Sequence, residues 1–91
     1  MQIHYKRNIH FTRLIKAEGR LREFNFRKLT GSDGEPVFTV DVSDDRGNRI
    51  LFRMNKTGNE WTIENQKQPA WILENEKQFH SIIEEELGQA G

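Results

Sequence analysis

The chain has 91 residues, 14 Lys and Arg against 14 Asp and Glu, and no cysteine. This length suits one small domain, 1–91, with a modest core. The lack of cysteine excludes disulfides, thiol catalysis and cysteine-ligated metal sites. No stretch approaches the roughly 20 apolar residues of a membrane span, and the N-terminus has no signal-peptide pattern. We therefore expect a cytoplasmic protein without a membrane partner.

The zero net charge conceals an uneven distribution along the chain. Residues 1–30 hold eight basic and two acidic residues, whereas residues 69–91 hold one basic and five acidic ones. Such a gradient indicates an anionic partner, pairing with a second copy, or pairing within the fold.

Residues 9–29 predict a β-hairpin, because apolar and polar residues alternate over 9–15 and again over 21–29. A three-residue loop at 17–19 would connect the two arms. It pairs Arg13 with Glu23 and Ile15 with Leu21.

The alternative for this segment is a helix over about residues 12–23. It would place Gly19 in the helix interior, at a cost of about 1 kcal/mol relative to Ala, which favours the hairpin. Residues 1–8 either extend the first strand or form a loose arm.

Residues 38–54 predict a second hairpin, whose turn has the sequence Asp44-Asp45-Arg46-Gly47-Asn48. Asp at the start of a type I turn and Gly at the following left-handed position are favoured. A loop of residues 45–47 gives the pairs Val42–Ile50, Val40–Phe52 and Phe38–Met54. All of these apolar residues then share one face of the sheet.

A third arm follows a turn around Gly58 at residues 55–59. Pairing Asn55 with Glu60 would continue the apolar face across this arm. It gives the pairs Met54–Trp61 and Phe52–Ile63.

The C-terminal part predicts one amphipathic helix that begins at Pro69 and ends at Gly88, with 88–91 as a frayed tail. Its apolar stripe consists of Ile72, Phe79, Ile83 and Leu87, widened by Trp71 and Ile82. Glu84, Glu85 and Glu86 lie in the last turn, where the helix dipole disfavours anions. We expect these acids to face basic residues of the N-terminal segment.

The predicted fold is therefore α+β: an antiparallel β-meander of four to five strands with one C-terminal helix packed on one face. The order of a sheet followed by one helix is similar to that in the repeats of PUR-type nucleic-acid-binding proteins. The similarity concerns architecture only.

The sequence predicts no catalytic, cofactor-binding or metal site. His80 and Glu84 share a helix face, but no third ligand is visible, so a helix-surface pair is favoured. The acids near Asp44 do not match the spacing of a calcium loop, and the turn already explains them. No nucleophile motif or phosphate-binding glycine loop occurs.

We therefore expect a small non-catalytic binding or interaction domain whose ligand the sequence does not specify. The alternative is a nucleic-acid-binding module that uses the basic N-terminal strands. The anionic partner would contact Arg13, Lys16, Arg20, Arg22, Arg27 and Lys28. Homodimerisation through a bare edge strand or an exposed Trp71 is a third possibility.

Overall fold

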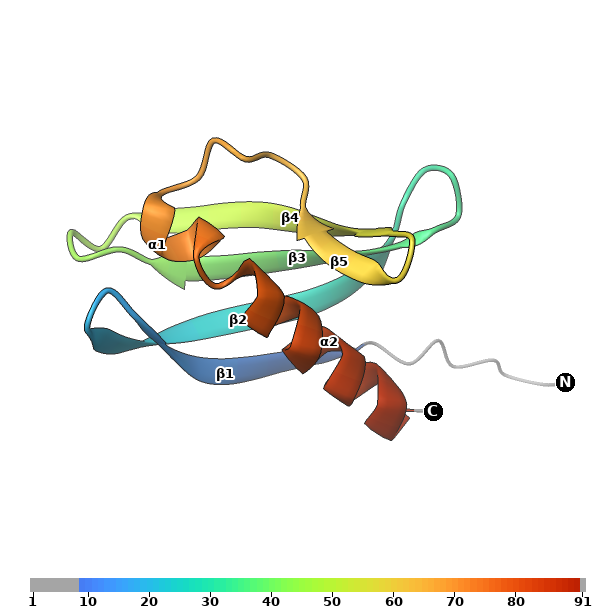
Figure 1. The fold of residues 1–91 in the computed structure, drawn as a ribbon, viewed down its shortest axis with the longest axis horizontal. Helices are drawn as coiled ribbons and strands as arrows, with labels where there is room; N and C mark the ends of the chain where they lie inside the picture. The colour runs from blue at the N-terminus through green and yellow to red at the C-terminus, as the bar shows by residue number, and fades with distance from the viewer. Residues whose placement is uncertain (1–8, 91) are drawn as a thin grey trace, which may run out of the picture.

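The computed structural model describes residues 9–90 as a curled sheet of five strands with two helices (Figure 1). The elements are β1 (His10–Ala17), β2 (Arg20–Thr30), β3 (Pro36–Ser43), β4 (Arg49–Thr57), β5 (Glu60–Ile63), α1 (Ala70–Leu73) and α2 (Glu76–Ala90). The prediction for residues 1–8 lies outside the described residues.

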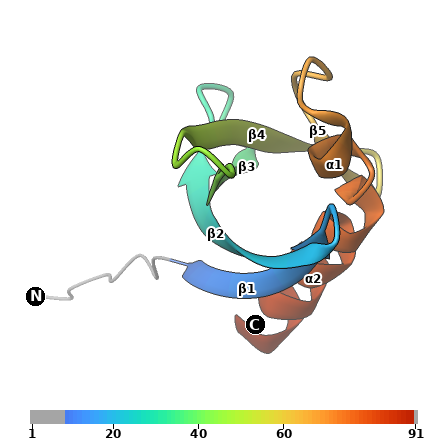
Figure 2. The same cartoon turned by 90° about the vertical axis from the view of Figure 1, so that its left-hand side faces the viewer.

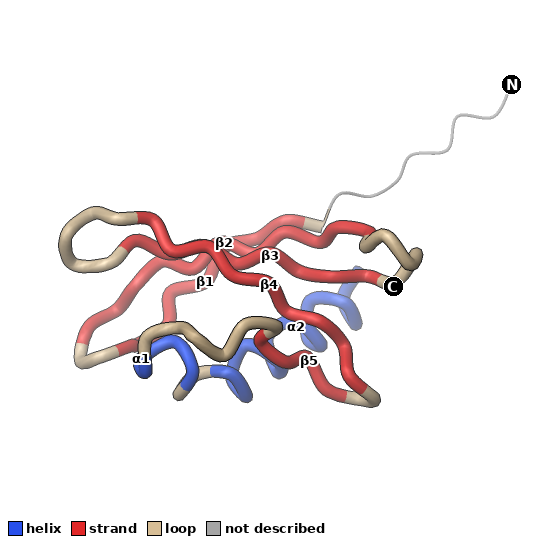
Figure 3. The backbone as a smooth tube through the Cα atoms, turned by 90° about the horizontal axis from the view of Figure 1, so that it is seen from above, coloured by secondary structure: helices blue, strands red, loops and turns tan. Residues whose placement is uncertain are grey.

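The strands form an antiparallel meander in the order β1-β2-β3-β4-β5. The sheet curls into an open arc, and α2 lies across the opening between the two edges (Figure 2). Both helices lie on the same side of the sheet (Figure 3). The predicted α+β class and the meander are confirmed.

The core lies between the concave face of the sheet, which we call the inner face, and the helices. Phe79 of α2 is fully buried at its centre. Its ring lies 5.2 Å from that of Phe24, 6.1 Å from that of Phe26 and 5.6 Å from that of Phe52, measured between centroids. One helix residue thus joins β2 and β4. The buried apolar residues are Ile15, Ala17, Phe24, Phe26, Phe38, Val40, Val42, Phe52, Met54, Trp61, Ile63, Ile72, Phe79 and Ile83.

The predicted register of the central hairpin is confirmed. Val42 pairs with Ile50, Val40 with Phe52, and Phe38 with Met54. In the turn, Asp44 Oδ1 accepts hydrogen bonds from the backbone N–H groups of Arg46, at 2.9 Å, and Asn48, at 2.8 Å. Gly47 has φ 81°, the left-handed conformation that its position requires.

The β1–β2 hairpin exists, but its predicted register is wrong by one residue. Ile15 pairs with Arg22, and Arg13 pairs with Phe24. The turn has two residues, Glu18 with φ 53° and Gly19 with φ 80°, as a type I′ turn requires. The tighter turn moves Leu21 to the outside, while Phe24 and Phe26 lie in the core.

The β4–β5 register is also wrong, by two residues. Met54 pairs with Ile63, and Lys56 with Trp61, because the turn contains only Gly58 and Asn59. Gly58 has φ 63° at the first of these positions, where type II′ turns place glycine. A shift of two residues preserves the faces, so Trp61 and Ile63 are still buried.

The predicted single helix is divided into α1 and α2. Asn75 interrupts it, since its N–H bonds to the carbonyl of Ile72, only three residues back, and its side chain donates to the carbonyl of Trp71 at 2.8 Å. The expected stop at Gly88 is wrong as well. Gly88 keeps a negative φ, and α2 continues to Ala90.

Two polar residues of α2 bind the outer edge of β5. The N–H of Trp61 donates to His80 Nδ1 at 2.9 Å, and the N–H of Ile63 donates to Glu76 Oε2 at 2.7 Å. Because Glu76 and His80 are four residues apart, they lie on one helix face. This face supplies the acceptors that a sixth strand would otherwise provide.

At its other end α2 reaches β1 through an ion pair between Glu86 and Arg13. The prediction that the last-turn acids face the basic N-terminal segment is confirmed for Glu86. Glu84 instead lies 3.7 Å from Lys56 Nζ of β4. The helix therefore spans the opening of the curled sheet with polar contacts at both ends.

Replacing Phe52 by Ala should lower the free energy of unfolding by roughly 3 to 5 kcal/mol, because the cavity would open beside Phe79. Urea denaturation measures this loss. The neighbouring Leu51→Ala is the control, and it should stay within about 0.5 kcal/mol because Leu51 faces solvent. Equal losses in both variants would contradict the assignment of faces.

Candidate functional site

The face of the sheet opposite the core, which we call the outer face, holds the large apolar side chains that are strongly exposed among the described residues. On β1 to β4 it comprises residues 10, 12, 14 and 16; 21, 23, 25, 27 and 29; 37, 39, 41 and 43; and 49, 51, 53, 55 and 57. Leu14, Leu21 and Leu51 are 66%, 64% and 62% exposed, and Leu29 is 38% exposed. Exposed apolar groups gathered on one face indicate an interaction surface.

A polar network crosses the middle of the outer face. Thr12 Oγ1 donates to Asn25 Oδ1 at 2.7 Å, and Asn25 Nδ2 donates to Asp41 Oδ1 at 3.0 Å. The other oxygen of Asp41 accepts from Arg49 Nη2 at 2.9 Å. One chain of hydrogen bonds thus links β1, β2, β3 and β4 and fixes the side chains at the centre of the face.

Asp41 is held as a carboxylate by this network. Partial burial raises its pKa, but the hydrogen bonds from Asn25 and Arg49 outweigh burial and hold the pKa below its ordinary value. The nearby guanidinium of Arg27 acts in the same direction. A carboxylate stabilised in this way accepts hydrogen bonds and is a poor proton donor.

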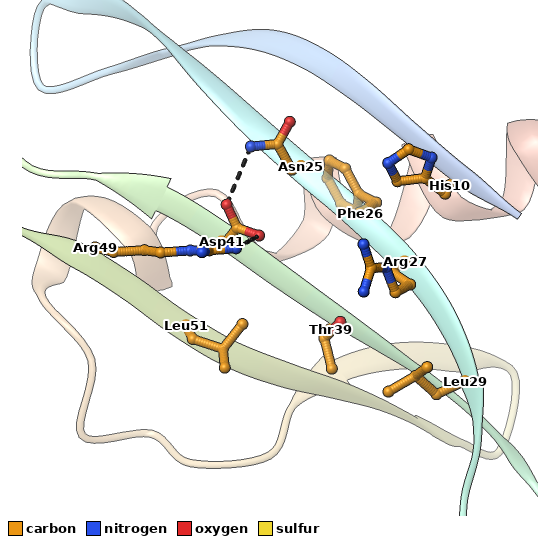
Figure 4. Close-up of a pocket in the computed structure, with 9 residues that line it drawn as sticks. All are labelled: His10, Asn25, Phe26, Arg27, Leu29, Thr39, Asp41, Arg49 and Leu51. Atoms are coloured by element: carbon orange, nitrogen blue, oxygen red, sulfur yellow. Dashed lines mark hydrogen bonds and ion pairs between the residues drawn. The ribbon is translucent and has the colours of Figure 1, made fainter.

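A depression of about 390 Å³ lies beside the network. His10, Arg27 and Leu29 border it from β1 and β2, and Thr39, Asp41, Arg49 and Leu51 border it from β3 and β4 (Figure 4). A second depression, of about 270 Å³, extends towards Leu21 and shares Asn25 and Asp41 with the first. The two form a groove along β2 and β3 with apolar residues at both ends.

The outer face is positively charged on β1 to β4. Its cations are Lys16, Arg27, Arg49 and Arg53, and its acids are Glu23 and Asp41. Arg49 is paired with Asp41, whereas Arg27 and Arg53 form no ion pair with the described residues. The face thus combines free guanidinium groups with exposed leucines.

The six basic residues predicted as an anionic-partner surface do not lie together. Arg13 is paired with Glu86, and Arg20 and Arg22 are both paired with Asp45, at 2.9 and 3.0 Å. Lys16 and Arg27 are exposed on the outer face, and Lys28 is exposed near the far end of β2. Whether this set contacts an anionic partner stays a prediction.

Arg22 is a structural residue, only 7% exposed. Its Nε donates to the carbonyl of Ala17 at 3.1 Å, and its guanidinium lies 4.5 Å from the ring centroid of Trp71. Together with the Asp45 pair, it joins the β1–β2 turn, the β3–β4 turn and α1. Trp71 also packs edge-on against Phe24 at 6.4 Å, so it covers the end of the sheet and is no exposed anchor.

The remaining candidates of the sequence also have structural partners. His80 binds the Trp61 N–H, and Asp44 binds its own turn, whose N–H from Asn48 is the main cause of its lowered pKa. Among residues 9–90 no group of three His, Asp or Glu side chains is placed to hold a metal ion. None of the described helices is long and apolar enough to cross a membrane.

The outer-face leucines are not among the candidate site residues predicted from the sequence. Leu51 alternates with the core residues of its strand, which is the signal that could have identified it. Leu14 likewise alternates with Ile15, whereas Leu21 was hidden by the wrong register, which placed it opposite the buried Ile15.

Comparison of the chain with protein families, with curated protein sequences and with solved structures finds no match.

The pairing of Asp45 with Arg22 should make stability depend on acid. The hydrogen bond from Arg22 is the main cause that lowers the pKa of Asp45 in the folded protein. The contribution of this pair to the free energy of unfolding is therefore present above the unfolded pKa of Asp, about 3.9, and is lost as pH falls through the folded pKa. Asp45→Asn should be less stable than the parent at pH 7, and the difference should narrow below about pH 4. Urea denaturation from pH 7 to about pH 2.5 measures it. A difference that stays constant would contradict the ion pair.

Proposed function

We propose that this protein is a non-catalytic interaction domain whose outer face binds a partner protein. The observation that carries the proposal is the gathering of Leu14, Leu21, Leu29 and Leu51 on the one sheet face that no element of residues 9–90 covers. A cytoplasmic location is part of the proposal, and the absence of cysteine is compatible with it.

The charge of the outer face indicates the chemistry of the partner. Arg27 of β2 and Arg53 of β4 flank Thr39 of the intervening β3, and neither has an acidic partner among the described residues. Exposed leucines lie on the same face. A surface with apolar groups and carboxylates complements this arrangement, because guanidinium groups form bidentate contacts with carboxylates.

A non-catalytic role is supported by the state of the polar groups. Asp41 is the acid nearest the depression, and its oxygens are occupied by Asn25 and Arg49. General acid–base catalysis favours a group whose pKa is tuned towards the working pH, whereas the pKa of Asp41 is shifted away from neutrality. The hydrogen bonds of Asp41 with Asn25 and Arg49 are better suited to holding the side chains of this surface in place than to transferring protons.

Nucleic-acid binding is the second candidate, supported by the cations Lys16, Arg27 and Arg53 on one face. The apolar residues of that face on β1 to β4 are leucine and valine. Single-strand binders stack bases on aromatic side chains, so the aliphatic character favours a protein partner.

Selection of a random peptide library on the immobilised domain tests the proposal. We expect enriched peptides that combine apolar and acidic residues and shift the NMR signals of the Leu29 and Leu51 methyl groups. Leu51→Lys should lower the affinity of these peptides about ten-fold or more, because a charge would replace an exposed apolar contact. The control is Gln78→Lys on the exposed side of α2, which should leave binding unchanged.

Two outcomes would overturn the protein-partner proposal. One is selected peptides that bind Leu51→Lys as tightly as the parent. The other is binding of a single-stranded or duplex oligonucleotide that falls steeply between about 50 and 200 mM salt, as counterion release requires. The second result would establish the alternative.

A further inference from the structure

The two edges of the sheet differ in what binds their backbone groups. At β5 the outward N–H groups of Trp61 and Ile63 are bound by His80 and Glu76 of α2. Natural sheets cover or blunt their edges because free N–H and C=O groups pair readily with another strand. One edge of this sheet is thus closed by its own helix.

The pairing register identifies the outward groups of β1. The hydrogen bond from the N–H of Lys28 to the carbonyl of Ile9 makes these two residues a hydrogen-bonded pair. In an antiparallel ladder every second residue bonds to the neighbouring strand. Residues 11, 13, 15 and 17 therefore bond to β2, and the residues between them point their N–H and C=O groups outward. These residues are His10, Thr12, Leu14 and Lys16.

Little within the described residues covers this edge. Of the outward backbone groups, the carbonyl of Thr12 accepts a hydrogen bond from Arg13 Nη1 at 3.2 Å, and no other has a partner among residues 9–90. The helix touches β1 from the inner side, through the ion pair of Glu86 with Arg13. The edge is eight residues long and carries Leu14, 66% exposed.

Charge decides which strand fits this edge. β1 contains His10, Arg13 and Lys16 and no acid, and residues 1–30 as a whole are strongly basic. Two copies that paired through β1 would bring like charges together, and like charges directly opposite each other are destabilising. An acidic strand would instead place opposite charges beside these residues, which stabilises the pairing.

We propose that the outer edge of β1 takes up an extended segment of a partner protein as a sixth strand. Its acidic side chains lie on the outer-face side, beside His10 and Lys16, and its apolar side chains lie on the inner side, beside the half-buried Phe11. Main-chain hydrogen bonds supply affinity and alternate side chains supply selectivity in this mode of binding. The inference goes beyond the proposed function, because it uses backbone groups of an edge and stands if the outer face binds nothing.

A ten-residue peptide of alternating Glu and Val, titrated into the full chain, tests this inference, and a Lys–Val peptide is its control. Amide hydrogen exchange at 10, 12, 14 and 16 should slow by about ten-fold or more at saturation, since these amides gain acceptors. The amides of 11, 13 and 15 already bond to β2 and should change little. The Lys–Val peptide should bind at least about ten-fold more weakly.

Two variants of Leu14 separate the backbone from the side chain. Leu14→Pro removes one outward N–H, and proline is tolerated on an edge strand at such a position. Leu14→Pro should lower the affinity for the Glu–Val peptide about ten-fold. Leu14→Thr, which keeps the N–H, should lower this affinity less than about three-fold. Leu51→Lys on the outer face should leave its affinity within about two-fold, which separates this edge from the surface of the proposed function.

The inference is overturned if the exchange of the β1 amides does not alternate on peptide binding, or if both peptides bind equally well. If exchange of the same amides slows as the protein concentration is raised without peptide, a second copy occupies the edge. This result would also overturn the inference. The exchange pattern is measured on the parent chain, so it decides the question even if Leu14→Pro fails to fold.

Discussion

The contacts of α2 with the edge of β5 are the constraint on which the rest of the structure depends. The N–H groups of Trp61 and Ile63 need acceptors, and His80 and Glu76 supply them from one helix face. This contact fixes the start of the helix against the last strand. Phe79, which lies between these two residues in sequence, then reaches the centre of the curled sheet and contacts rings of β2 and β4.

The surfaces left for binding follow from this arrangement. The helix fills the concave face and covers one edge, so the outer face and the β1 edge are what β1 to β4 offer to other molecules (Figure 2). The polar network from Thr12 to Arg49 holds the outer face rigid across four strands. A rigid surface loses less entropy when it binds.

The fold could be predicted from the sequence where turn chemistry and apolar alternation agreed. Asp44 and Gly47 fixed the central turn, and the pairs of Val40 and Val42 with their partners followed. The first hairpin failed because Glu18, a residue without a strong turn preference, adopts a positive φ beside Gly19. A shift of one residue exchanges the two faces of a strand, and this error hid Leu21.

The candidate site was less accessible to sequence reasoning. The basic residues of the N-terminal strands predict one surface, but Arg22 is buried against Trp71. Its partner Asp45 lies in a turn 23 residues later in the chain. Long-range pairs of this kind leave no local pattern. The helix divides at Asn75, whose side chain donates to the carbonyl of Trp71, and Glu76 directly after it accepts from the N–H of Ile63 on β5.

Amide hydrogen exchange of the free protein tests most directly the claim that the helix closes one edge of the sheet and leaves the other open. The amides of Trp61 and Ile63, bound by His80 and Glu76, should exchange slowly, as buried hydrogen-bonded amides do. Those of Leu14 and Lys16 should exchange rapidly, while their neighbour Ile15 is protected by β2. Rapid exchange at Trp61 and Ile63, or slow exchange at Leu14 and Lys16, would contradict the account.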